Sequence, residues 1–243
     1  LIVRKEKDRL RTYFHIGTGN YNAKSSTTYT DLGLLSAQPE IGQDLIELFN
    51  YLTGFSKQQD FRKLLVAPVT LRKGIEELIN REINNAKNGR PARIRAKMNS
   101  LVDPRIINLL YEASSVGVGI ELIVRGMCCL YPEKKGLSEN IKVISVIGRF
   151  LEHSRIFWFL NQGNSEVFIG SADWMRRNLD RRVEAVTPIK NIELKKQLEQ
   201  LLDLYLSINC GAWSMKSNGE FVRLKRKENE IHSQEEILKI FNK

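Results

Sequence analysis

The sequence predicts an α/β protein in which a mixed or parallel sheet is flanked by helices. Strands alternate with amphipathic helices over residues 70–147, and this alternation is typical of an α/β sheet. A hairpin followed by a glycine turn and a helix occurs twice along the chain, which indicates two related units. The length of 243 residues, 42% of them hydrophobic, is enough to bury a sizeable core.

Each element of this fold has its own signal in the sequence. Apolar runs joined by polar turns predict hairpins, and apolar residues at three- and four-residue steps predict helices. Asp103 as N-cap and Pro104 in the first turn mark the start of one helix. The expected hairpins and strands are 1–17, 93–101, 120–126, 141–147 and 155–170. The expected helices are 40–54, 70–89, 103–117 and 192–207.

The two related units lie 153 residues apart. The turn GTGN begins at Gly17 and the turn GSAD begins at Gly170, each where a predicted strand ends. The same offset matches Asp31 with Glu184 and brings two predicted helices into register. The chain begins abruptly within a strand, so we expect the first unit to extend upstream. The expected units are 1–63, the C-terminal part of a first lobe, and 64–243, a complete second lobe with a basic tail.

Composition limits the class of protein and its surroundings. No apolar run approaches the roughly 20 residues that cross a bilayer, and the first residues lack the pattern of a signal peptide. The cysteines, Cys128, Cys129 and Cys210, are odd in number and lack zinc-like spacing, so we expect a reducing cytoplasm. The formal net charge of +10 predicts attraction to polyanions. Charge alone does not separate nucleic acid from nucleotides or polymeric phosphate.

Polar side chains at predicted strand ends form the candidate site. His153 is followed two residues later by Arg155, whose planar guanidinium suits two phosphate oxygens at once. The alternative for His153 is a strand-edge histidine that is bonded only to its neighbours. Lys97 and Asn99 share one face at a strand end, either toward the site or as a polar edge.

The turn after the second hairpin adds further candidates. Gly170 allows close backbone approach, and Ser171 offers a hydroxyl to an anion. Asp173 either orients an imidazole or caps the segment that follows it. Within RRNLDRR we expect Arg177 and Arg182 at the phosphate site, whereas the neighbouring Arg176 and Arg181 are expected to face water.

The duplicated unit and the histidine followed by a basic residue resemble the phospholipase D superfamily, in which two lobes each present one histidine to a shared cleft. Six stretches are similar, more specifically, to the C-terminal half of bacterial polyphosphate kinases of the phospholipase D-like type. They occur in order across most of residues 12–190, namely HIGTGNYN, YTDLGLL, AKMNSLVD, ELIVRGMC, ISVIGRFLEHSRI and GSADWMRRNLDRRVEAVTP.

The resemblance implies a reversible transfer of the terminal phosphate of ATP to inorganic polyphosphate, through a phosphohistidine and with Mg²⁺. It implies that His153 is the second catalytic histidine, which donates or accepts a proton beside the phosphates. It also implies that Tyr29, Arg125 and Arg182 contact the nucleotide or its phosphates. The supporting residues would be Asn20, Lys97, Asn99, Arg155, Ser171, Asp173 and Arg177. We expect no metal ligand among the side chains.

One part of the family pattern is missing from this sequence. The nucleophilic histidine of the family lies in a Lys-x-His-x-Lys strand, which would fall a few residues before Leu1. We therefore expect that this chain alone does not form the phosphoenzyme. His15 aligns with Phe168 in the repeat and is expected to be buried and hydrogen-bonded, and His232 is expected to be inert.

Other functions fit parts of the sequence. A phospholipase D-like phosphodiesterase would use water as the acceptor, a basic nucleic-acid-binding module would need only the charge, and a structural or oligomerising domain would need neither. We expect polyphosphate and an adenine nucleotide as partners, no nucleic acid, and a homo-oligomer in the full-length enzyme. Peripheral association of the full-length enzyme with a membrane is left open. Trp158 and Trp174 are expected in the core, and the tail 219–243 either docks on a neighbouring subunit or folds back.

Overall fold

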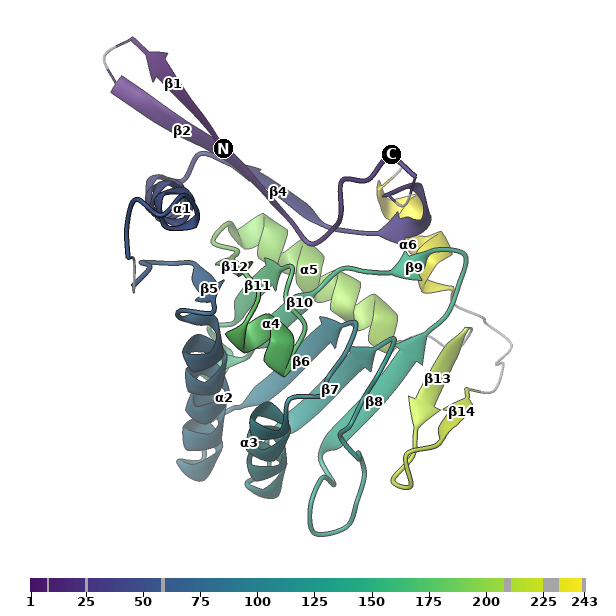
Figure 1. The fold of residues 1–243 in the computed structure, drawn as a ribbon. Helices are drawn as coiled ribbons and strands as arrows, with labels where there is room; N and C mark the ends of the chain where they lie inside the picture. Colours follow the sequence, from purple (N-terminus) through teal and green to yellow (C-terminus); the bar gives the residue numbers. More distant parts are fainter. Residues whose placement is uncertain (8, 25, 58–59, 208–210, 225–231, 242–243) are drawn as a thin grey trace.

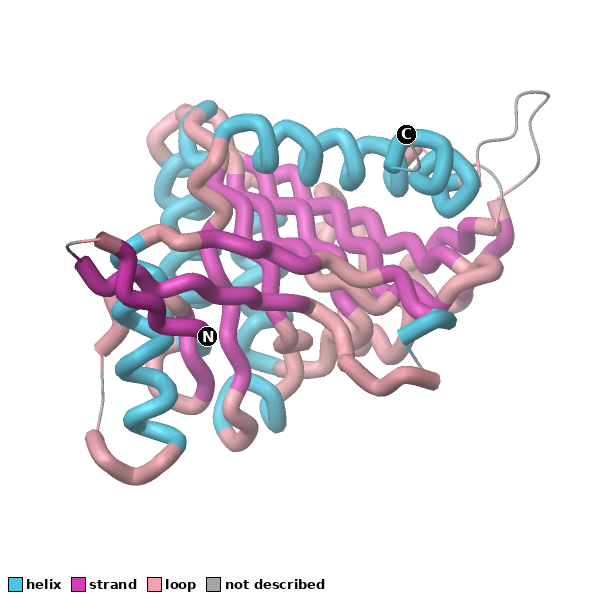
Figure 2. Tube along the Cα trace, turned by 90° about the horizontal axis from the view of Figure 1, so that it is seen from above, coloured by secondary structure: helices cyan, strands magenta, loops and turns pink. Residues whose placement is uncertain are grey.

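A computed structural model describes residues 1–7, 9–24, 26–57, 60–207, 211–224 and 232–241. The described part of the chain contains a large sheet, a small sheet and a two-stranded parallel pair. Helices cover both faces of the large sheet (Figures 1 and 2). This arrangement confirms the predicted α/β class. Within the described residues no helix has both the length and the apolar character needed to cross a bilayer.

The large sheet contains nine strands in the order β14-β13-β8-β7-β6-β10-β11-β12-β5. Its bounds are β5 Leu65–Ala67, β6 Arg93–Met98, β7 Gly119–Val124, β8 Ile141–Val146, β10 Ile156–Phe159, β11 Glu166–Gly170, β12 Glu184–Pro188, β13 Ala212–Met215 and β14 Phe221–Arg223. Strands β6, β7 and β8 are parallel, and the remaining pairs are antiparallel. The sheet is therefore mixed.

The two faces of the large sheet are buried against different helices. On one face lie α2 (Leu71–Lys87) and α3 (Pro104–Ser115), and on the other lies α5 (Ile192–Leu206). Strand β10 alternates accordingly, with Phe157 in the core under α2 and α3, and Trp158 in the core under α5. Burial on both faces explains the nearly continuous apolar runs of these strands. Trp158 and Trp174 are buried, as predicted.

The small sheet has the order β1-β2-β4, and its hairpin extends away from the rest of the molecule (Figure 1). The strands are β1 Ile2–Glu6, β2 Arg9–Gly17 and β4 Gly33–Ser36. Helix α1 (Pro39–Leu52) packs on one face through a core that includes Phe14, Ile16 and Leu45. Strands β3 (Tyr29–Thr30) and β9 (Leu151–Glu152) form the parallel pair that joins the first unit to the second.

The internal repeat is visible in strand pairing. His15 pairs with Leu35 between β2 and β4, and Phe168 pairs with Pro188 between β11 and β12, so both partners shift by 153 residues. Helices α1 and α5 also begin 153 residues apart. The division of the chain at residue 64 stays a prediction, because Val66 packs in the small core while its strand belongs to the large sheet.

The structure shows the surroundings of His15 and of the C-terminal tail. The expected burial of His15 is wrong, because α1 covers the opposite face of the small sheet and the imidazole is exposed. It is hydrogen-bonded, as expected, to the Tyr21 hydroxyl. The tail folds back, since α6 (Ser233–Phe241) packs beside α5. Short strands that no sequence signal had marked include β3, β4, β5, β9, β12, β13 and β14.

The cysteines that the structure describes are free thiols. Cys128 and Cys129 are not in a disulfide, and Cys210 lies outside the described residues. Burial raises the pKa of the Cys128 thiol to about 11.

Candidate functional site

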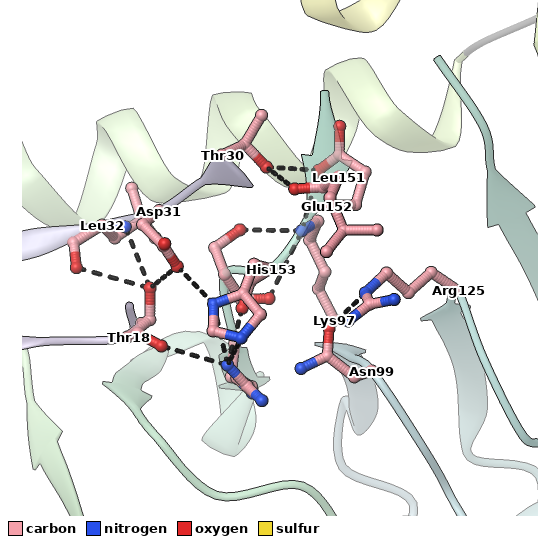
Figure 3. Close-up of polar contacts among 12 residues, drawn as sticks. Thr18, Thr30, Asp31, Leu32, Lys97, Asn99, Arg125, Leu151, Glu152 and His153 are labelled. Atoms are coloured by element: carbon pink, nitrogen blue, oxygen red, sulfur yellow. Dashed lines mark hydrogen bonds and ion pairs between the residues drawn. The ribbon is translucent and has the colours of Figure 1, made fainter. Parts of the chain in front are cut away.

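His153 lies between β9 and β10, where the first and second units meet (Figure 3). Its backbone N–H donates to the carbonyl of Thr30, at 3.2 Å, which continues the pairing of β3 with β9. The imidazole stacks on the ring of Tyr29 with centroids 4.8 Å apart and an interplanar angle of 27°. With 9% of the residue exposed, the ring is held among polar groups and does not lie in the apolar core.

A carboxylate orients the imidazole. Asp31 Oδ1 lies 2.9 Å from Nδ1 of His153, and Thr18 Oγ1 donates to the same carboxylate oxygen at 3.0 Å. The Thr18 hydroxyl in turn accepts the backbone N–H of Leu32 at 2.9 Å. With its N–H at Nδ1 donated to the carboxylate, the imidazole keeps its lone pair on Nε2, which lies 3.2 Å from Nη1 of Arg155 and can exchange a proton with a ligand. We assign this tautomer from the hydrogen-bond partners. The turn at residues 17–20 thus takes part in the site through Thr18.

Arg155 forms hydrogen bonds to His153 and to both glycine turns. Its Nε and Nη2 each lie 3.2 Å from a carboxylate oxygen of Asp173, and Nη1 donates to the carbonyl of Thr18 at 3.0 Å. The same Nη1 donates to the carbonyl of His153 at 2.8 Å and lies 3.3 and 3.2 Å from the two ring nitrogens. Asp173 also accepts the N–H of Asn99. The buried charges of Arg155 and Asp173 are therefore paired and hydrogen-bonded, as buried charges need to be.

Arg125 is a guanidinium at the site that the described carboxylates leave unpaired. Its Nε donates to Asn99 Oδ1 at 2.6 Å, and among the described residues no carboxylate lies within salt-bridge distance. Burial lowers the pKa of the half-buried Arg125 and the charge of Arg155 lowers it further, although an arginine stays protonated at neutral pH. An open pocket of about 320 Å³ lies beside it, lined also by Arg149 and Glu152. Such a site favours an anionic ligand.

Lys97 forms a buried ion pair and binds the two residues on either side of His153. Lys97 Nζ lies 2.9 Å from Glu152 Oε2 and donates to the Ser154 hydroxyl at 2.7 Å. Glu152 also accepts the hydroxyl hydrogens of Tyr205, at 2.6 Å, and Thr30, at 2.9 Å. Burial opposes ionisation of Glu152, but Lys97 and the hydrogen bonds from Tyr205 and Gln234 outweigh it and hold its pKa below the usual range. Burial likewise lowers the pKa of Lys97.

The structure brings most of the predicted site residues into one network. Hydrogen bonds, an ion pair and a ring contact connect seven of them through Asp31, Thr18, Glu152 and Ser154, namely Tyr29, Lys97, Asn99, Arg125, His153, Arg155 and Asp173. The carboxylate at the imidazole is Asp31, and Asp173 holds Arg155 instead.

Four predicted residues make no direct contact with the residues of this network. Ser171 donates its hydroxyl to Glu184, and Arg182 lies exposed, 3.8 Å from the same carboxylate. Arg177 is exposed on the short helix α4 (Arg176–Asp180), and Asn20 is exposed after β2. Glu184 also accepts from Asn178, which accepts the N–H of Asp173, so Ser171 and Arg182 are linked to Asp173 indirectly. Among the described residues, Arg177 has no side-chain hydrogen bond or ion pair that joins it to His153.

Sequence reasoning missed several residues that hold the imidazole. Asp31 had a signal, because the repeat matched it with Glu184 without assigning a role. The matched pairs make the same contact, since Thr18 donates to Asp31 and Ser171 donates to Glu184. Glu152 adjoins His153 in sequence but gave no signal of its own.

The side chains of the site do not make a dedicated magnesium site. Among the described residues no group of three or more His, Cys, Asp and Glu side chains is placed to hold a metal ion. Asp31 is committed to His153 and Thr18, and Asp173 is committed to Arg155. Mg²⁺ that is held mainly by substrate phosphates needs few protein ligands.

The fold and the site define an α/β protein of two related units that meet at one histidine. The family model for polyphosphate kinase C-terminal domain 1 matches residues 1–58, and that for C-terminal domain 2 matches residues 64–234. The chain therefore belongs to the polyphosphate kinase family.

Individual relatives agree with the family models. A polyphosphate kinase of Prochlorococcus marinus is 68% identical over 243 residues, which are 99% of this chain and 34% of that protein. The crystal structure of polyphosphate kinase from Porphyromonas gingivalis has a TM-score of 0.93 and 37% identity, over 100% of this chain and 38% of that one. The phospholipase D family member Nuc from Salmonella typhimurium gives a TM-score of 0.46 at 14% identity, over 64% of this chain and 97% of that one. The chain spans about a third of the length of the curated relatives it matches.

Proposed function

We propose that the chain is the C-terminal catalytic part of a polyphosphate kinase, which transfers the terminal phosphate of ATP to inorganic polyphosphate and back through a phosphohistidine. The observation that supports this most directly is the oriented imidazole of His153, which Arg155, Asp173 and Asn99 link to the half-buried cation of Arg125. Asp31 holds Nδ1, so Nε2 is the atom that would exchange a proton with the substrate.

In this proposal each residue has a defined task. His153 gives a proton to the leaving phosphate oxygen of the nucleotide, or takes it back in the reverse direction. Arg125 pairs with phosphate oxygens and stabilises the charge on the transferring group. Tyr29 fixes one face of the imidazole and, with Arg182, contacts the nucleotide. The backbone around His153 is kept in place by Arg155, Asp173, Asn99 and Lys97.

The nucleophile of the reaction would come from elsewhere in the protein. The chain has three histidines, and none stands in a Lys-x-His-x-Lys sequence. We propose that Mg²⁺ enters as the counter-ion of the nucleotide phosphates. The proposed location in a reducing cytoplasm is based on the number and spacing of the cysteines. A homo-oligomer and peripheral membrane association are predictions for the complete enzyme.

Replacement of His153 tests the proposed function. In the complete enzyme, His153→Ala should lower the rate of ATP-dependent polyphosphate synthesis by about 10²- to 10⁴-fold, the range that a general acid or base contributes. His15→Ala, which removes an exposed histidine of the small sheet, is the matched control and should leave the rate unchanged. Synthesis at the wild-type rate in His153→Ala would exclude the proposed role, and hydrolysis of phosphodiesters by the wild type would favour the phosphodiesterase alternative.

A further inference from the structure

The C-terminal helix α6 is hydrogen-bonded to residues 150–152, just before His153, through the side chain of Gln234. Gln234, in the first turn of α6, is 7% exposed. Its Oε1 accepts the N–H of Phe150 at 2.9 Å, and its Nε2 donates to the carbonyl of Phe150 and to Glu152 Oε1, both at 2.8 Å. The amide thus binds both backbone groups of one residue and a buried carboxylate. This use of all its hydrogen-bonding groups is typical of a specific contact.

The fit between α6 and the segment 147–152 is close at this point and open on either side. A Cβ at Gly148 would lie 2.5 Å from Oε1 of Gln234, so a larger residue at position 148 would displace the amide. Cavities of about 140 and 340 Å³ flank the contact, and Gln234 lines both. The interaction of α6 with the segment is therefore concentrated at Gln234.

Glu152 connects Gln234 to the surroundings of His153. Oε2 of Glu152 receives Lys97, Tyr205 and Thr30, whereas the described donor to Oε1 is Gln234. Thr30 also accepts the N–H of His153, the residue that follows Glu152. The two neighbours of Thr30 are the stacking Tyr29 and the orienting Asp31. Displacement of Glu152 would therefore shift the backbone on both sides of the imidazole.

We propose that Gln234 is a positioning residue, through which the C-terminal helix holds the segment 147–152 and sets the place of the His153 imidazole. The effect of Gln234 on the reaction rate rests on the proposed function, whereas its effect on the position of the His153 imidazole does not. Without the amide, the buried Glu152 Oε1 lacks its donor, and an unsatisfied buried acceptor is costly. The segment then opens to let water in.

The test replaces Gln234 by methionine in the complete enzyme. Gln234→Met keeps the length of the side chain and removes its hydrogen bonds, while Glu235→Gln changes the exposed neighbour on the same helix and serves as control. If the methionine variant fails to fold, Gln234→Ala removes the same hydrogen bonds and leaves room for water at Glu152 Oε1. Three measurements follow, namely amide hydrogen exchange of residues 147–153, the rate at which diethylpyrocarbonate modifies His153, and steady-state kinetics.

We expect faster exchange of the segment and faster modification of His153 in the Gln234 variants, with the control like the wild type. We expect kcat to fall about ten- to a hundredfold, the cost of a misplaced catalytic group, with little change in the KM for ATP. Wild-type exchange and modification would overturn the proposal, whatever the activity. Altered exchange with an unchanged kcat would overturn the positioning role. If the wild type lacks polyphosphate synthesis, the proposed function fails, and exchange and modification alone decide on Gln234.

Discussion

At the scale of single residues, His153 is held by groups that come from distant parts of the chain. Asp31 orients its ring, Tyr29 stacks on it, and Arg155 binds its carbonyl. Thr18 is bonded to both Asp31 and Arg155, so one hydroxyl and one carbonyl of the first glycine turn set the geometry. An imidazole fixed in this way needs no rearrangement before it exchanges a proton.

Asp31→Asn tests the orienting role of the carboxylate. We expect kcat for polyphosphate synthesis by the complete enzyme to fall by about a hundredfold, because an amide no longer selects the tautomer with a free Nε2. The KM for ATP should change little. Glu193→Gln, on the exposed side of α5, is the control. A kcat within about twofold of the wild type would show that Asp31 does not orient the reacting ring.

Residue patterns predicted the histidine and missed its partner. His153 and Arg155 were recognisable because the spacing of a histidine and a basic residue is local in sequence. Asp31 lies 122 residues from His153, and the two meet only through the pairing of β3 with β9, strands of two residues each. Such short strands carry no periodic signal.

At the scale of elements, α3 is fixed by a carboxylate that serves as both cap and ion-pair partner. Asp103 accepts the backbone N–H groups of Arg105 and Ile106, and both its oxygens receive the guanidinium of Arg72 on α2. Burial opposes ionisation of Asp103, but Arg72 and the amide of Ile106 outweigh it and hold the pKa of Asp103 below its usual value of 3.8. The N-cap was predictable from Asp103 and the proline after it, whereas the contact with α2 was not.

Asp103→Asn should lower the free energy of unfolding by about 2–4 kcal/mol at pH 7, since the change removes one charge of a buried pair. A lowered folded-state pKa adds stability that is complete above the unfolded value of 3.8 and is lost as the pH falls through the lower folded value. The difference between wild type and variant should therefore shrink below pH 3.8. Urea unfolding of the chain measures it, with Glu77→Gln on the exposed face of α2 as control. A difference that stays constant with pH would refute this account.

At the scale of the whole molecule, the two units share a strand arrangement but use the matching carboxylates differently. The pairing of β2 with β4 and of β11 with β12 keeps the same offset, and each unit places a hydroxyl on a carboxylate after its glycine turn. In the first unit that carboxylate, Asp31, reaches the imidazole of the second. In the second unit Glu184 binds Ser171 and Asn178 instead. The repeat was readable from sequence, but this asymmetry depends on how the units meet.

The net charge of +10 gives a second test at this scale, because general attraction and a specific site respond differently to mutation. Arg125→Ala should weaken polyphosphate binding by the complete enzyme about tenfold, the loss expected for a charged hydrogen bond. Arg90→Ala, which removes an exposed charge, should have a smaller effect that disappears as salt is added. Equal losses for both variants, with equal salt dependence, would indicate a non-specific polyanion surface.

In the proposed reaction the oriented imidazole of His153 faces the phosphates of a bound nucleotide. A crystal structure of the complete enzyme with a non-hydrolysable ATP analogue tests it most directly. We predict that Nε2 of His153 lies within about 3.2 Å of a phosphate oxygen, with Asp31 still at Nδ1 and Arg125 on the phosphate chain. A nucleotide bound with no oxygen in hydrogen-bond reach of Nε2 would contradict the account.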